Sequence, residues 1–253
     1  MKTNRASKIF LLLSLLLILL AFFMVNFQSK SQNTPISGLF IILMAIPSYY
    51  ALYRWLGLGK SVSILLILSL YAFIIETFAI ITGFPYSSFH YTDQIGFKIA
   101  GYTPYTLPFA YVPIFLGSIY LASIISRNIY SYFLITTFIV LLVDIMLDPA
   151  AVALKFWIYH SPGIFYNVPL MNFLGWILTG FLAALITYPL LSKELFQSKP
   201  SALVSSLFLI LSFWMSVCFY LGLILPGLIG LFLWLFVLWI TRMDVAIFSK
   251  YTI

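Results

Sequence analysis

The sequence predicts an all-α integral membrane protein, a single polytopic domain over residues 1–253 with a bundle of about eight transmembrane helices. Hydrophobic residues make up 63% of the chain, charged residues only 8%, and the mean hydropathy is +1.11. A soluble domain carries about 25% charged residues and could not cover its surface with this supply. The net charge of +7 therefore concerns membrane topology and is no sign of nucleic-acid binding.

Apolar runs of the length that a membrane helix needs recur along the whole chain. Crossing the hydrocarbon core takes about 20 apolar residues in a helix. Such runs lie at residues 8–25, 36–53, 61–82, 107–126, 129–147, 169–191, 201–220 and 223–241. The first resembles a signal peptide, but no small-x-small cleavage site follows it, so we expect it to remain as a helix. The last two are expected to join tightly around Pro226 and Gly227.

Two connections are long, near residues 83–106 and 148–168, and both are rich in aromatic residues, glycine and proline. The other connections are short. The single cysteine, Cys218, allows no disulfide within the chain.

The distribution of cations predicts the orientation, because cytoplasmic segments of membrane proteins are enriched in Lys and Arg. With a cytoplasmic N-terminus and eight alternating helices, ten cations are cytoplasmic and three are not. The ten are Lys2, Arg5, Lys8, Arg54, Lys60, Arg127, Lys193, Lys199, Arg242 and Lys250, and the three are Lys30, Lys98 and Lys155. We therefore expect a multi-pass protein of the cell membrane with both termini cytoplasmic and both long connections on the non-cytoplasmic side.

Three of the six acidic residues are expected within the helices close to that side. Asp144 and Asp148 are four residues apart, a spacing that puts both side chains on one face of a helix. Pro149 is expected to end that helix just after Asp148. Glu76 lies about two turns before Gly83, where the third helix is expected to end. Three carboxyl groups from two helices are thus expected to meet beneath a lid formed by the two long connections.

Carboxyl groups at membrane depth are expensive to bury and indicate function by default. Two that share one site do not both ionise easily, so one keeps its proton and an acid and a base stand side by side. A purely structural role is the alternative: Asp148 would hydrogen-bond the backbone of its loop, and Glu76 would pair with a tyrosine hydroxyl.

Aromatic and polar residues of the two long connections and the following helix are candidates for substrate binding. Aromatic residues at these positions commonly form an interfacial belt, and they can also line a groove for a long apolar ligand or stabilise a cation. The candidates are Tyr86, His90, Tyr91, Trp157, His160, Tyr166, Asn172 and Trp176.

We expect neither a metal nor an organic cofactor. The chain has two histidines, no His-x-x-His and no Glu-x-x-His. Asp144-x-x-x-Asp148 lacks the second acidic motif that membrane prenyltransferases use for Mg²⁺ and diphosphate. There is no phosphate-binding loop, dinucleotide fingerprint or Ser-His-Asp order.

Three blocks in one order resemble a known family. Glu76 with TGFPYSSFHY (Thr82–Tyr91), DIMLDP (Asp144–Pro149) and GIFYNVPLMNFLGW (Gly163–Trp176) is similar to the carotenoid biosynthesis membrane proteins, which include the carotenoid 1,2-hydratases acting on bisanhydrobacterioruberin and γ-carotene. Ser87 and Asn167 stand where the family pattern has glycine. These two differences bear on which carotenoid is used.

The resemblance implies that water is added across the terminal (1,2) double bond of an acyclic carotenoid ψ-end, which gives a tertiary alcohol. This chemistry needs a proton donor, a base for the incoming water and an apolar groove, but no redox cofactor. On this reading Asp144 is the acid, Asp148 the base, and Glu76 the third catalytic residue. The partners are a long apolar carotenoid, water, the lipid bilayer and, in a pigment pathway, other carotenoid enzymes.

Two other functions remain open from the residues alone. Buried acids also mark proton relays, so a proton-coupled transporter of lipids or isoprenoids is one alternative. A non-catalytic membrane subunit of a pigment pathway is the other. Pigment analysis separates them, because only the hydratase (a hydro-lyase) adds one water to the carotenoid.

Reporter fusions at Thr92 and Ser198 should report opposite sides of the membrane, with Ser198 in the cytoplasm. The reason is the cation bias, which places an odd number of helices between these positions. If both positions reported the same side, the two long connections would not share one face of the membrane.

Overall fold

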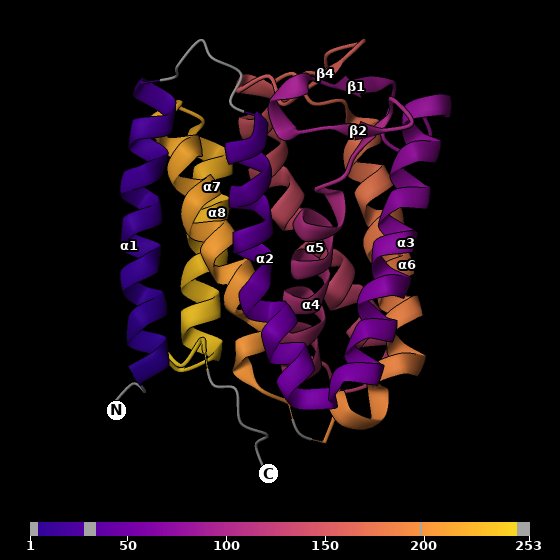
Figure 1. The fold of residues 1–253 in the computed structure, drawn as a ribbon, viewed down its shortest axis with the longest axis vertical. Helices are drawn as coiled ribbons and strands as arrows, with labels where there is room; N and C mark the ends of the chain where they lie inside the picture. The colour runs from indigo at the N-terminus through magenta and orange to yellow at the C-terminus, as the bar shows by residue number, and fades with distance from the viewer. Residues whose placement is uncertain (1–4, 28–33, 198, 247–253) are drawn as a thin grey trace.

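A computed structural model describes residues 5–27, 34–197 and 199–246 of the 253-residue chain. It confirms an all-α bundle with eight long helices in the described residues (Figure 1). They are α1 (Arg5–Asn26), α2 (Thr34–Leu56), α3 (Leu58–Thr82), α4 (Leu107–Ile125), α5 (Ile129–Ala153), α6 (Leu170–Leu195), α7 (Ser205–Tyr220) and α8 (Ile224–Ile240). Seven spans within this region are long and apolar enough to cross a membrane, and α8 is shorter, with 17 residues.

Two predicted helix ends were wrong. Pro149 does not end α5, which continues to Ala153. A proline inside a helix removes one backbone hydrogen bond, and membrane helices tolerate this loss where neighbouring helices pack closely, as they do against the fully buried Ala150 and Ala151. Pro226 and Gly227 do not form the last connection either, because they lie within the first turn of α8. Proline near a helix start removes an N–H that has no partner within the helix.

The two long connections meet at one end of the bundle, as predicted. Strand β1 (Phe89–Tyr91) of the first connection pairs antiparallel with β4 (Trp157–Tyr159) of the second. A smaller antiparallel pair, β2 (Lys98–Ile99) with β3 (Thr103–Pro104), lies within the first connection, after the short 3-10 helix η1 (Asp93–Ile95). Together these segments cover the upper end of the bundle (Figure 1). We call them the lid (residues 83–106 and 154–169).

The opposite end of the bundle carries most of the cations. Lys2, Lys30, Lys250 and Ser198 lie outside the described residues. Among the cations that are described, eight lie at the end opposite the lid: Arg5, Lys8, Arg54, Lys60, Arg127, Lys193, Lys199 and Arg242. The other two, Lys98 and Lys155, belong to the lid. The unequal distribution between the two ends matches the pattern on which the predicted orientation rests.

Helices α4 and α7 form the centre of the bundle, since nearly all of their residues are buried. Small and hydroxylated residues bring neighbouring helices close: a Cβ atom on Gly117 of α4 would lie 2.6 Å from Leu207 of α7. Ser48 of α2 donates a hydrogen bond to the carbonyl of Leu203 at 2.8 Å and accepts one from the N–H of Ser206 at 3.1 Å. Such close contacts are the usual basis of helix packing in lipid, where tails are as apolar as the side chains.

The first part of the lid is held against α6. Gly83 ends α3 in the left-handed conformation with φ of 79°, and Ser87 adopts the same φ. Asn167, in the second part, has φ of 66°. Both Ser87 and Asn167 stand where the family pattern has glycine, the residue that this backbone conformation favours. Tyr86 is buried against Gly175 of α6.

Replacing Gly175 by alanine should therefore destabilise the protein. The new Cβ would lie 2.6 Å from the carbonyl oxygen of Pro85 and 2.5 Å from the Tyr86 ring. Overpacking of this kind costs about 1–3 kcal/mol, measured as the loss in free energy of unfolding in detergent. Gly59→Ala is the matched control, because nothing lies within 4 Å of a Cβ there. It should leave stability unchanged or raise it by up to about 1 kcal/mol. Equal effects of the two substitutions would contradict the close lid contact.

Candidate active site

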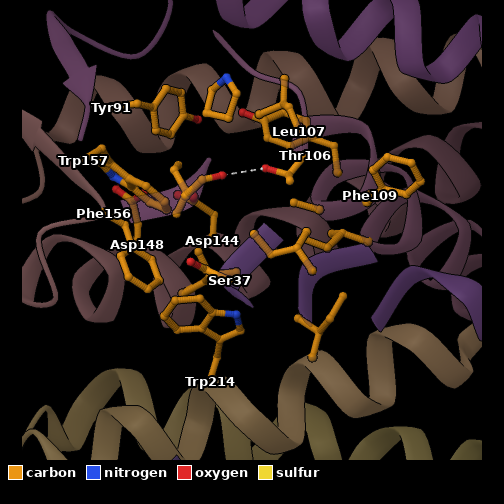
Figure 2. Close-up of a pocket in the computed structure, with 18 of the residues that line it drawn as sticks. Ser37, Tyr91, Thr106, Leu107, Phe109, Asp144, Asp148, Phe156, Trp157 and Trp214 are labelled. Atoms are coloured by element: carbon orange, nitrogen blue, oxygen red, sulfur yellow. Dashed lines mark hydrogen bonds between the residues drawn. The ribbon is translucent and has the colours of Figure 1, made fainter. Parts of the chain in front are cut away.

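A cavity of about 620 Å³ lies beneath the lid. Figure 2 shows Asp144, Asp148, Trp157 and Tyr91 grouped on one side of it, with Phe109 on the other. Its walls come from α1 to α7 and from both parts of the lid. Glu76, Asp144 and Asp148 all line it, which confirms that the three predicted carboxyl groups share one site.

Glu76 reaches the cavity from α3 and is 1% exposed. Each of its two oxygens accepts a hydrogen bond from a tyrosine: Oε1 from Tyr91 of β1 and Oε2 from Tyr111 of α4. The tyrosine contact that the structural alternative anticipated is thus present. It fixes the Glu76 carboxyl from two sides and leaves it at the cavity wall.

Asp144 and Asp148 reach the cavity from one face of α5 and are 4% and 3% exposed. Asn172 of α6 donates from its Nδ2 atom to both, at 2.9 Å to Asp144 Oδ2 and 3.0 Å to Asp148 Oδ2. Tyr159 of β4 donates to Asp148 Oδ2 at 2.8 Å. One amide therefore bridges the two carboxyl groups and holds them as a pair, as the four-residue spacing predicted.

The donors to these acids are neutral groups. Within the described ranges, the ion pairs are Lys60–Glu194 and Lys98–Asp93, and neither belongs to the cavity. Burial raises the pKa of the Tyr91 and Tyr159 phenols well above the ordinary value, and the charges of Glu76 and Asp148 raise them further. These phenols therefore stay protonated and remain hydrogen-bond donors at any physiological pH.

Aromatic rings surround the carboxyl groups. The ring centroid of Trp176 lies 4.9 Å from that of Tyr111 and 5.7 Å from that of Tyr86. Trp157 meets Tyr91 edge to face at 5.8 Å. Ring faces of this kind attract positive charge. Of the predicted binding residues, Tyr86, Tyr91, Trp157, Asn172 and Trp176 line the cavity.

His90, His160 and Tyr166 are not among the residues that line it, so the cavity gives no support to their predicted role. Side chains alternate between the two faces of a strand. Phe89 and Tyr91 of β1 point inward, which turns His90 outward. His160 is also exposed, and its Nε2 lies 3.1 Å from Nδ1 of His90. The two histidines link the two parts of the lid on its outer surface. Among the described residues, no three or more His, Cys, Asp or Glu side chains are arranged so that they could hold a metal ion.

Two polar residues of the site were missed by sequence reasoning. They are Tyr159 and Tyr111, and neither is among the candidate residues predicted from the sequence. The available signal for Tyr111 is a phenol within an apolar helix, because a buried hydroxyl needs a partner. The apolar residues contributed by α1, α2 and α7 were missed as well.

The sequence profile described as "Carotenoid biosynthesis protein" matches residues 36–237, which is most of the chain. The chain belongs to the carotenoid biosynthesis protein family. The resemblance predicted from the three sequence blocks is thereby confirmed. The matched region contains Glu76, Asp144 and Asp148 and begins within α2, so α1 precedes it.

One relative in this family is the bisanhydrobacterioruberin hydratase of Haloarcula japonica, which is 39% identical over 126 residues. The match covers 48% of this chain and 43% of that protein, so it spans less than half of the relative's length. No solved structure matches the chain.

Tyr111→Phe should destabilise the protein, because it leaves a buried oxygen of Glu76 without its donor. An unsatisfied buried polar group costs about 1–3 kcal/mol in free energy of unfolding, measured by denaturation in detergent. Tyr130→Phe serves as the control, since Tyr130 is 77% exposed, and it should change stability little. A Tyr111→Phe protein as stable as the control would show that the contact with Glu76 is dispensable.

Proposed function

We propose that the protein is a carotenoid hydratase that adds water across the terminal (1,2) double bond of an acyclic carotenoid ψ-end. Family membership and the hydratase relative support this proposal. The observation that carries it is the meeting of three buried carboxyl groups in one cavity lined mainly by apolar and aromatic side chains. A proton donor, a base and an apolar binding site are what hydration of an alkene requires.

The reaction begins with proton transfer from a carboxylic acid to the alkene carbon that leaves positive charge on the tertiary centre. Water then attacks the cationic carbon, and a carboxylate accepts a proton from that water. One C–H bond and one C–O bond form, while the alkene π bond and one O–H bond of water break. The proton taken up by the base then returns to the acid, so both carboxyl groups recover their starting states and no redox cofactor takes part. Aromatic faces such as those of Trp157 and Trp176 stabilise the intermediate charge.

We assign the acid to Asp144. Among the described side chains it accepts a hydrogen bond from Asn172 alone, through Oδ2, so its other oxygen remains for a transferable proton. Asp148 is the base: Tyr159 and Asn172 both donate to its Oδ2, an arrangement that favours the carboxylate form.

Glu76 is the third member of the cluster. Both of its oxygens accept hydrogen bonds from Tyr91 and Tyr111, so we assign it the role of holding these phenols and the water at the cavity wall. The proton transfers to the substrate and from water are assigned to the two aspartates and not to Glu76.

We further propose that the end of the bundle with eight described cations faces the cytoplasm. Cytoplasmic segments are enriched in Lys and Arg, and the lid end carries only Lys98 and Lys155 within the described residues. The lid then lies on the outer side of the cell membrane, and the carboxyl cluster lies just beneath it.

Asp144→Asn should abolish hydration while the protein remains folded in the membrane. The substitution keeps the shape of the side chain and removes its ionisable proton, and general acid–base groups contribute about 10²–10⁴-fold to rate. The measurement is pigment analysis in a lycopene-producing host, where the product is heavier by one water.

Asp93→Asn is the matched control for this experiment. Asp93 is an exposed acid paired with Lys98 at 2.8 Å, outside the cavity, so its loss should leave hydration unchanged. Parental rates in Asp144→Asn, Asp148→Asn and Glu76→Gln alike would make the carboxyl groups structural and the proposed mechanism wrong.

A further inference from the structure

We infer that the cavity opens sideways into the bilayer between α1 and α2, and that the reacting end of a linear polyene passes through this opening to the carboxyl groups. The inference rests on the proposed function for the identity of the ligand. Of the residues that line the cavity, only Leu20 of α1 and Ile36 of α2 are largely exposed, at 45% and 65%. We call the gap that they flank, together with Met24 and Phe40, the side opening.

The packing of the helices explains why the gap exists. Helix α1 packs along α7 and makes little contact with α2. Ser14 of α1 donates a hydrogen bond to Ser212 of α7 at 2.8 Å. The Ser212 hydroxyl also accepts one from the indole N–H of Trp234 of α8 at 2.9 Å. Helix α2 is held in the half that lies away from the lid, where Ser48 contacts Leu203 and Ser206. Both helices contact α7, and they make little contact with each other.

The side opening suits an apolar ligand and not water. The side chains that flank it are Leu20, Met24, Ile36 and Phe40, and all are apolar. Phe213 of α7 lies behind it, with its ring centroid 4.9 Å from that of Phe40. The side chains along the path become more buried and more polar from these residues toward the carboxyl groups.

Hydrogen bonds hold the lid against the helices beneath it. Ser37, at the lid end of α2, donates to the carbonyl of Gln94 at 2.5 Å. Thr106, just before α4, donates to the carbonyl of Ile95 at 3.1 Å (Figure 2). These bonds join the first part of the lid to α2 and α4. The lipid-facing gap is left as the way in for a molecule dissolved in the bilayer.

The size of the cavity determines how much of the ligand it holds. A volume of about 620 Å³ lies in the range of pockets for small molecules, which is about 300–1,000 Å³. A long linear polyene exceeds this volume. Its end group occupies the cavity while the rest of the chain lies in the side opening and the surrounding lipid. A substrate with two reactive ends must then leave and return to react at the second.

Helix α1 lies outside the part of the chain that the family profile matches. The match to the family begins at residue 36, so Ile36 and Phe40 fall within it while Leu20 and Met24 precede it.

Leu20→Trp tests the opening, with Leu19→Trp as the matched control. Leu19 is 53% exposed on the same helix but does not line the cavity. An indole at position 20 fills the opening and blocks the entry of the polyene, so the hydration rate with Leu20→Trp should fall about tenfold. Leu19→Trp should keep the parental rate. Both proteins should show the parental midpoint of thermal unfolding, since both positions are exposed.

A labelling experiment tests the opening without relying on hydration. Leu20→Cys and Leu19→Cys are each placed in a Cys218→Ser background, because Cys218 is the only native cysteine. In lipid vesicles an apolar maleimide should label both. Added lycopene should slow the labelling of Leu20→Cys about tenfold, because the polyene occupies the opening, and should leave Leu19→Cys unaffected.

The outcomes separate the two proposals. Protection of Leu20→Cys in a protein that never hydrates lycopene would support the opening and contradict the proposed function. Parental hydration by Leu20→Trp, together with unprotected Leu20→Cys, would overturn the opening and leave the hydratase proposal standing. If Leu20→Trp failed to fold, protection or its absence in Leu20→Cys would still decide.

Discussion

The burial of three carboxyl groups, with no described Lys or Arg paired to them, is the constraint on which the rest of the structure depends. In a low-dielectric interior each buried acid needs hydrogen-bond donors, because an unpaired polar group there costs several kcal/mol. The donors come from elements far apart in the chain: Tyr91 and Tyr159 from the lid, Tyr111 from α4 and Asn172 from α6. The site therefore exists only when four helices (α3, α4, α5 and α6) and both parts of the lid are assembled around it.

The same constraint explains how one cavity combines apolar walls with three carboxyl groups. Neutral donors hold the carboxyl groups without neutralising them by a cation, so proton exchange with a substrate remains available. Aromatic rings fill the space that polar groups leave, and they provide faces that tolerate positive charge. The hydrogen-bond donors and the apolar walls therefore stabilise the bundle and also suit the proposed chemistry.

Much of the fold could be predicted because long apolar runs identify membrane helices. The pairing of Asp144 with Asp148 follows from their helical spacing alone. The left-handed backbone at Ser87 and Asn167 agrees with the glycines of the family pattern. The role of Tyr111 could not be predicted, because a helix that is apolar all round has no polar face to indicate its rotation. The end of α5 was predicted wrongly at Pro149, because close packing in the bundle outweighs the local tendency of proline to end a helix. The outward turn of His90 depends on a three-residue strand too short for sequence patterns to reveal.

The pairing of β1 with β4 has a consequence for biogenesis. Helix α3 with Glu76 is synthesised before Tyr111, and β1 must wait for β4, whose residues pair with it across more than sixty positions of sequence. Until then the Glu76 carboxyl lacks its full set of donors and the first half of the lid has no neighbouring strand. The cluster of acids is thus a late product of assembly, and a chain interrupted before β4 would hold helices in the membrane without a finished site.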